Sequence, residues 1–285
     1  MIYVLASAIC SVLVSVLLKL ARRFSLDVAQ LVAWNYAAAA LAALLLQPAL
    51  APLHASSAPW FALLGLGVLL PTIFLALGAS VRHAGIVRSD VAQRLSLLLS
   101  LLAAFALFGE RLDATKALGC VLGLLALLGM VWRTQHDQSA KGAVGWYWPL
   151  LVFVGFGAID VLFKRVAAAG VPLGTSLLAM FVLALPVAFA LAAWQRLRGG
   201  ARFTLRNALG GLLLGLLNFG NIFFYLRAHR ALPQHPALVF ASMNLGVVVL
   251  GALASVLLFR ERLSRINLAA LLLALLAIVL LTRGA

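Results

Sequence analysis

The chain has 285 residues, of which 65% are hydrophobic and only 10% are charged, and its mean hydropathy is +1.12. So few polar side chains cannot cover a water-facing surface, which excludes soluble enzymes, nucleic-acid readers and disulfide-stapled domains. The net charge of +15 does not indicate a nucleic-acid partner, because the basic residues concentrate between apolar segments, where they meet lipid headgroups. The composition predicts an all-α integral membrane protein in a lipid bilayer.

Ten apolar segments follow one another, each close to the roughly 20 residues that cross a bilayer. Lipid offers the backbone no hydrogen-bond partner, so each segment is expected to be a helix. The first begins directly after Met1 without a basic stretch or cleavage site, which favours a transmembrane helix over a signal peptide. The spans are expected at residues 2–20, 28–47, 60–80, 84–108, 114–132, 146–166, 173–194, 207–228, 234–258 and 264–282.

The two halves of the chain resemble each other. The stretch AFALFGERLDATKALGCVLGLLALLGMV, residues 104–131, matches ASVLLFRERLSRINLAALLLALLAIVLL, from residue 254, at a shift of about 150 residues. Likewise VSVLLK, ending at Lys19, matches IDVLFK, ending at Lys164. We therefore expect two five-helix units, 1–141 and 142–285. An odd number of spans per unit inserts the second copy upside down, so the ten transmembrane helices would form two inverted repeats.

Each unit closes with a span, a GERL or RERL turn and a Gly- or Ala-rich last helix. This pattern resembles the EamA-type members of the drug/metabolite transporter superfamily over essentially the whole chain. The resemblance implies a monomeric ten-helix secondary transporter or exporter of small metabolites, multi-pass in the cell membrane, with a central cavity between the halves. The family's proline early in the fourth helix of each unit is replaced here by Ser96-Leu97 and Val247-Val248, so no helix break is expected there.

The orientation of the termini is judged from lysine and arginine in the connectors. Seven lie on the side that holds both termini and fourteen on the opposite side, so the positive-inside rule places both termini outside. The family resemblance implies termini in the cytoplasm. The two indications disagree, and the orientation stays open.

Charged side chains inside a span cost about 2.5 to 3.5 kcal/mol at the centre of a helix, so each is a candidate for function. Arg94 lies deepest, near the bilayer midplane, and Asp90 precedes it by four residues, a spacing at which the two side chains can pair. Nearby polar residues form a stripe expected to line a wet cavity: Ser89, Gln93, Ser96 and Ser100. We interpret Asp90, Gln93, Arg94 and Ser96 as substrate-binding, and a structural ion pair with interhelical hydrogen bonds is the alternative.

Amides beside aromatic rings mark three further spans. Such groups suit a small polar solute that carries an amine and a carboxylate, and an ordinary interhelical hydrogen-bond network explains them equally well. Asn244 aligns with Gln93 across the repeat, so an amide is present in both halves. The substrate-binding candidates in this group are Trp34, Asn35, Asn218, Asn221, Tyr225 and Asn244.

Ser15 and Asp160 occupy matching repeat positions, each four residues before a lysine, and both are candidates for coupling or gating. Lys164 is expected to pair with Asp160, which would keep that carboxylate charged and prevent it from carrying a proton at rest. Simple anchoring of the helix end by Lys164 is the alternative. Ser7, Ser11 and Ser15 recur at intervals of four, which favours either a cavity face or close helix packing.

Prolines and glycines inside the spans predict bends and close contacts. Pro71 and Pro186 should kink their helices and are candidate gating hinges, although prolines in membrane helices are often merely tolerated. Small residues four apart favour helix packing, and two such pairs occur: Gly119 with Gly123, and Gly211 with Gly215.

The chain has no phosphate-binding GxxxxGK[ST] loop, no HExxH pair and no GxSxG elbow, so we expect no enzyme, no metal and no cofactor. The leading prediction is a secondary transporter or exporter of a small polar metabolite, with amino acids as candidate solutes. Two alternatives stay open. A lipid-linked flippase is suggested by many arginines near headgroup depth, and a non-transporting scaffold or receptor would bind partners through the basic loop at 195–206.

Overall fold

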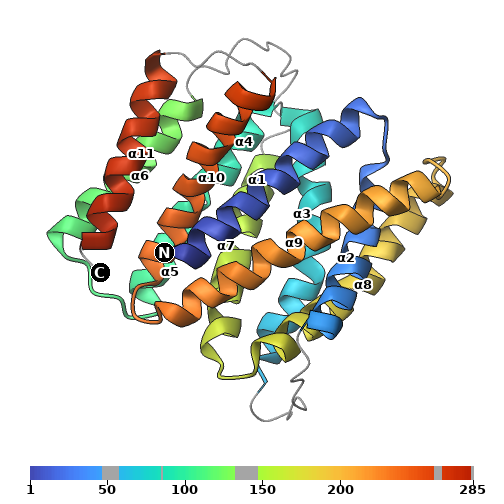
Figure 1. Cartoon of the computed structure of the whole chain (residues 1–285), viewed down its shortest axis with the longest axis horizontal. Helices are drawn as coiled ribbons and strands as arrows, with labels where there is room; N and C mark the ends of the chain where they lie inside the picture. Colours follow the sequence, from blue (N-terminus) through green and yellow to red (C-terminus); the bar gives the residue numbers. More distant parts are fainter. Residues whose placement is uncertain (47–57, 85, 132–146, 260–264, 284–285) are drawn as a thin grey trace.

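The computed structural model describes residues 1–46, 58–84, 86–131, 147–259 and 265–283, and these form helices joined by short connectors (Figure 1). The prediction of an all-α chain is confirmed for the described residues, in which each expected span coincides with one helix or, for the fourth span, with two. The helices are α1 (Ile2–Arg23), α2 (Val28–Leu46), α3 (Trp60–Ala84), α4 (Ile86–Leu95), α5 (Leu97–Ala106), α6 (Ala114–Val131), α7 (Tyr147–Ala168), α8 (Leu173–Leu197), α9 (Leu205–Ala231), α10 (Pro236–Phe259) and α11 (Arg265–Arg283).

Six helices, α1, α2, α3, α8, α9 and α10, are long and apolar enough to cross a membrane. The outer surface of the bundle carries large apolar side chains that water would not tolerate in such number. On α11, for example, four leucines along its length are 48% to 62% exposed: Leu268, Leu272, Leu275 and Leu276. This surface suits lipid, and the chain is a multi-pass integral membrane protein.

The fourth span is interrupted, contrary to expectation. Residues 86–106 form two helices, α4 and α5, which meet at Ser96. The Ser96 hydroxyl donates to the Gln93 carbonyl at 2.6 Å, and a serine that bonds back to its own helix in this way often bends it. The equivalent stretch of the second half is unbroken, because Val247 and Val248 lie inside continuous α10. The expectation of no break was therefore wrong at Ser96 and right at Val247-Val248.

The main helix contacts of the first half have counterparts in the second. Helix α9 packs against α1 and α2, just as α3 packs against α7 and α8. Helix α10 packs against α1, just as α4 and α5 pack against α7. Three contacts join matching helices directly, α2 with α8, α5 with α10 and α6 with α11, and the last pair lies at one edge of the molecule (Figure 1).

The predicted glycine contacts are confirmed as packing. A Cβ atom on Gly211 would lie 2.5 Å from Trp34 Cβ, and one on Gly215 would lie 2.6 Å from Ala38 Cβ, so α9 approaches α2 closely at both positions. On α6, a Cβ atom on Gly119 would lie 2.8 Å from the Leu281 side chain of α11. Gly123 allows a looser approach, 3.2 Å from Leu245.

A buried amide fixes α2 to the connector before α9. The Gln30 side chain is 2% exposed, and its amide nitrogen donates to the carbonyls of Ala201 and Arg202 at 3.1 and 3.0 Å. Its oxygen accepts from the Asn207 side chain at 2.9 Å. This network and the glycine contacts hold α2 against α9, and both helices contribute to the cavity described below.

Candidate functional site

A cavity of about 470 Å³ lies among helices of both halves, within the range of roughly 300 to 1,000 Å³ typical of small-molecule sites. Residues of α1, α2, α3, α4, α7, α9 and α10 line it, together with Ser96. Nine of the predicted site residues meet there: Ser15, Gln93, Arg94, Ser96, Asp160, Asn218, Asn221, Tyr225 and Asn244.

Asp160 presents a carboxylate to this cavity from α7. Its Oδ2 atom accepts a hydrogen bond from the Ser100 hydroxyl at 2.7 Å, and its Oδ1 atom accepts one from the Tyr225 hydroxyl at 2.9 Å. The donors come from α5 and α9, so the carboxylate joins three helices across the two halves. Two neutral hydroxyls orient a carboxylate without cancelling its charge, which leaves it able to attract a cationic group.

The expected pair between Asp160 and Lys164 does not form among the described residues. The Lys164 ammonium donates to the Pro233 carbonyl at 2.7 Å instead, and it lies over the ring of Phe108. Spacing alone allowed the pair, but the connector between α9 and α10 offers the lysine a closer acceptor. The argument that Lys164 keeps Asp160 from carrying a proton therefore no longer holds.

The polar stripe of the interrupted helix faces the cavity only in part, because Ser89 is hydrogen-bonded to Ser80 of α3 and Ser100 does not line the cavity. Gln93, Arg94 and Ser96 all line it, and Asn244 faces it from α10, as the alignment of Asn244 with Gln93 predicts. Asp90 belongs to α4, but its side chain lies outside the described part of the structure. The predicted ion pair with Arg94 therefore stays a prediction.

The serine face of α1 meets the amides of α9. The Ser7 hydroxyl is fully buried and donates to both the backbone carbonyl and the side-chain oxygen of Asn221, at 2.8 and 2.9 Å. Ser11 and Ser15 lie one and two turns further along and line the cavity. The serine repeat thus serves both roles that its spacing allows, because Ser7 joins two helices while Ser11 and Ser15 face the cavity.

Two predicted residues of α2 lie outside the cavity lining. Asn35 is 1% exposed in the contact between α2 and α9, and the Trp34 ring packs edge-on against Phe189 of α8, with ring centroids 5.5 Å apart. Tyr36 is the residue of α2 that reaches the cavity. Its hydroxyl is buried without a hydrogen-bond partner among the described residues, so a bound solute could supply one.

The two predicted hinge prolines lie away from the lining. Pro71 is buried inside continuous α3, and Pro186 lies inside continuous α8 and is exposed on the outer surface. Helix α3 nevertheless contributes three residues around Pro71 to the cavity, which are Leu70, Ile73 and Phe74. A gating role for either proline stays a prediction.

Sequence reasoning missed the apolar wall of the cavity. Beside the polar groups, the lining contains aromatic, aliphatic and thioether side chains. In a chain this apolar, such residues look the same whether they face lipid, a neighbouring helix or a cavity, so hydropathy gave no signal. The apolar lining consists of Leu70, Ile73, Phe74, Phe156, Ile159, Phe163, Ile222, Met243 and Val247.

Comparisons with known proteins agree with this architecture. A relative from Haemophilus influenzae (strain ATCC 51907 / DSM 11121 / KW20 / Rd), described as an uncharacterized protein, is 41% identical over 267 residues, which cover 91% of this chain and 90% of the relative. A solved crystal structure has the same fold, with a TM-score of 0.74 and 19% identity over 99% of both chains. Residues 1–132 match the model of the EamA-like transporter family. The predicted resemblance is therefore confirmed, and the chain belongs to the EamA-like transporter family, whose members are membrane transporters of the drug/metabolite transporter type.

Proposed function

We propose that this chain is a secondary transporter that carries a small zwitterionic solute, of the amino-acid class, across the cell membrane by alternating access. One observation carries the proposal. A single cavity between the halves is lined by a carboxylate, Asp160, and by a guanidinium, Arg94. Charges of both signs inside a membrane protein are expensive and usually mark a transport pathway.

The lining supports a solute with two opposite charges and an uncharged remainder. The Asp160 carboxylate suits the ammonium group, and Arg94, which binds carboxylates in a planar fork, suits the carboxylate. Amides of Gln93, Asn218 and Asn244 offer both donors and acceptors for the polar part of the solute. The apolar wall accommodates a hydrocarbon or aromatic side chain.

Alternating access is supported by the matched helix packing of the two halves, 1–141 and 142–285. We propose that these halves are inverted repeats related by an axis in the membrane plane, which gives ten spans in all. Ser15 and Asp160 occupy matching positions of the two repeats, and Tyr36 and Phe181 are separated by the same number of residues, so they match as well. The rings of Tyr36 and Phe181 lie against each other, with centroids 6.5 Å apart. Matching residues meet in this way close to an axis of symmetry. Both halves contribute to the cavity. A rocking motion of the two halves around the cavity would therefore expose the solute to each side of the membrane in turn.

The chain alone holds the whole cavity, and we propose that it works as a monomer. The absence of a nucleotide-binding loop in the sequence means that a gradient, of the solute or of an ion, drives transport. We propose no nucleic-acid partner and no cofactor.

Purified protein in detergent tests the solute class directly. Thermal unfolding is followed with phenylalanine and leucine and with analogues that lack one charge: phenethylamine, 3-phenylpropionate, isoamylamine and 4-methylpentanoate. A ligand that binds only the folded state raises the melting temperature. We expect stabilisation by one or more amino acids and at least about tenfold weaker binding of the matched analogues.

The Asp160→Asn and Arg94→Gln variants extend the test. We expect Asp160→Asn to lose the preference for an intact ammonium group and Arg94→Gln to lose the preference for an intact carboxylate. Counterflow of radiolabelled amino acid into proteoliposomes then tests transport itself. Equal binding of zwitterion and analogues, or wild-type selectivity in both variants, would contradict the proposed solute class.

A further inference from the structure

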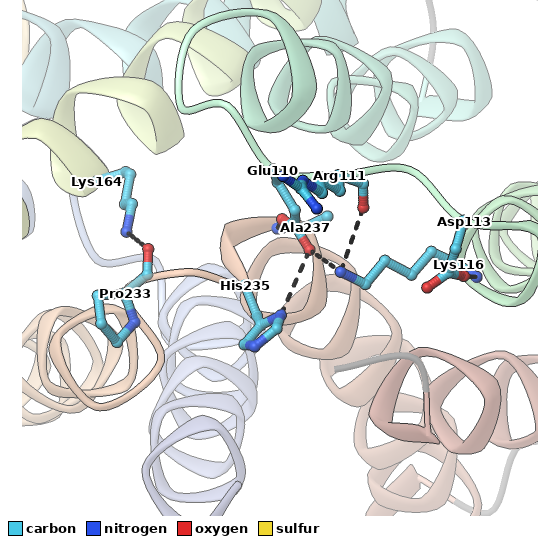
Figure 2. Close-up of polar contacts among 8 residues, drawn as sticks. All are labelled: Glu110, Arg111, Asp113, Lys116, Lys164, Pro233, His235 and Ala237. Carbon is cyan, nitrogen blue, oxygen red and sulfur yellow. Dashed lines mark hydrogen bonds and ion pairs between the residues drawn. The ribbon is translucent and has the colours of Figure 1, made fainter.

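A second group of charged residues lies away from the cavity, at the end of the molecule where both termini lie (Figures 1 and 2). Its centre is Glu110, in the connector between α5 and α6, whose side chain is only 1% exposed. The Oε2 atom of Glu110 accepts a hydrogen bond from the backbone N–H of Ala237 at 2.7 Å. Ala237 lies in the first turn of α10, so a carboxylate of the first half caps a helix of the second half.

The local chain is built to present this carboxylate. Gly109 has φ +66, a conformation that favours glycine, and the Glu110 N–H then bonds back to the Ala104 carbonyl at 3.1 Å. Asp113 starts α6 by accepting the backbone N–H of Lys116 at 2.7 Å. The Lys116 side chain in turn lies 3.1 Å from Glu110 Oε1 (Figure 2). Glu110 and its cationic partner thus belong to the same segment.

A second contact crosses between the halves beside Glu110. Lys164 is 4% exposed, donates to Pro233 in the connector between α9 and α10, and lies over the ring of Phe108 from the first half. His235 follows in the same connector, with Nδ1 3.9 Å from Glu110 Oε1. Glu110 and Lys164 therefore hold the start of α10 and the turn before it (Figure 2).

Aromatic rings connect this cluster with the wall of the cavity. Phe163 and Tyr225, which line the cavity, have ring centroids 5.8 Å apart. His229, one turn further along α9, packs against Tyr225 and against Phe240, at 4.8 Å from each, and is 1% exposed. These rings join α7, α9 and α10, and Phe163 directly precedes Lys164, so they connect the wall of the cavity with the Glu110 cluster.

We propose that Glu110 is a gating residue, whose contact with the first turn of α10 holds the terminal end of the cavity shut and breaks when the cavity opens to that side. The inference rests on the proposed transport by alternating access. Breaking the contact is inexpensive because Lys116 stays beside Glu110 on its own segment. The carboxylate is then never left without a cation, and the Ala237 N–H, which is buried here but only three residues from the exposed Gln234, gains water when this end opens.

Accessibility of a cavity residue from each side of the membrane tests this gate. The full chain, with Cys10→Ala and Cys120→Ala, carries Val247→Cys as a reporter in the cavity lining. In sealed vesicles a membrane-impermeant maleimide is added to one side or the other, and a tag after Ala285 identifies the terminal side. We expect Glu110→Ala to raise the labelling rate from the terminal side at least about fivefold and to lower it from the opposite side.

Asp113→Ala is the matched control, because Asp113 is a carboxylate of the same connector that caps α6 and does not contact α10. We expect it to leave both labelling rates at the parental value. Glu110→Gln keeps the shape of the side chain and an oxygen for the Ala237 N–H but loses the charge, and a smaller rise is expected. Gel filtration and thermal unfolding show which variants fold. If Glu110→Ala does not fold, the labelling rates of Glu110→Gln test the gate.

Unchanged rates in a folded Glu110 variant, or an equal rise in Asp113→Ala, would overturn the gate. The labelling needs no solute, so its result is independent of the solute class. A shift in labelling without any amino acid binding would refute the proposed solute and keep the gate. If the protein transports amino acids and its labelling rates do not depend on Glu110, the gate is refuted and the proposed solute is kept.

Discussion

Asp160 shows how a single side chain takes its role from its neighbours rather than from its own helix. Along the sequence its nearest charged partner is Lys164, yet the structure gives it two hydroxyl donors from other helices, Ser100 and Tyr225. Lys164 instead joins the cluster around Glu110. A spacing of four residues predicts that two side chains share a face of a helix, but not that they contact each other.

Tyr225→Phe tests this view of the Asp160 site at the scale of one atom. The change removes one hydroxyl that orients Asp160 and keeps the ring in its packing against Phe163. A neutral hydrogen bond contributes about 1 kcal/mol net, so we expect roughly fivefold weaker binding of the amino acid found in the thermal-shift experiment. Titration of purified variants measures the Kd.

The control for this prediction is Tyr147→Phe, which removes a tyrosine hydroxyl outside the cavity lining and should leave the Kd unchanged. Wild-type affinity in Tyr225→Phe would show that Asp160 needs no orientation by that hydroxyl.

Helix packing in this protein depends on positions where a side chain is absent. Helices α2 and α9 approach most closely at Gly211 and Gly215, and Gln30 anchors the start of α2 to the connector before α9. Without a hydrophobic force between helices in lipid, close contact and buried hydrogen bonds supply the cohesion. The same elements place Tyr36, Asn218 and Asn221 around the cavity.

Gly215→Ala should disturb this contact, because the added Cβ atom would lie 2.6 Å from Ala38 Cβ and closer still to the Asn35 backbone oxygen. Overpacking of this kind costs about 1 to 3 kcal/mol, so we expect a lower melting temperature in detergent and weaker solute binding.

Gly251→Ala is the matched control, since nothing lies within 4 Å of the added atom. Alanine favours a helix over glycine by about 0.5 to 1 kcal/mol, so an unchanged or slightly higher melting temperature is expected there. An equal loss of stability in both variants would contradict the packing argument.

For the whole molecule, the proposed inverted repeat makes a prediction about topology. The connector between α1 and α2 and its counterpart between α7 and α8 should lie on opposite sides of the membrane. We expect Phe24→Cys and Ala168→Cys, each in a chain without native cysteines, to react with an impermeant maleimide from opposite sides of sealed vesicles. Reaction from the same side would exclude the inverted arrangement.

Intact cells test the orientation, on which the charge distribution and the family resemblance disagree. A reporter fused after Ala285 and active only in the cytoplasm would place both termini there and show that the basic loop at 195–206 is translocated. A silent reporter would support the positive-inside rule.

Hydropathy predicted the order and approximate ends of the helices, except that it gave one span where α4 and α5 form, because lipid forces every long apolar segment to satisfy its own backbone. The GERL and RERL turns pointed to the family, and glycine spacing predicted that Gly211 and Gly215 pack against another helix, without naming which one. Charged and amide side chains also located much of the cavity, since polar groups inside a membrane avoid lipid and face either a cavity or another helix. The interruption at Ser96 could not be read in this way, because a serine inside a helix either bonds back to its own backbone or faces a neighbour.

Only the tertiary structure decided which polar groups share a site. It brought Ser100 and Tyr225 to Asp160, turned Lys164 toward Pro233, excluded Trp34 and Asn35 from the cavity lining, and joined Glu110 to the start of α10. Each of these contacts links residues far apart in the sequence, and local pattern carries no information about such pairs. Apolar side chains can face lipid, a neighbouring helix or a cavity at similar cost. The hydrophobic wall of the site could therefore be found only by locating the cavity in the structure.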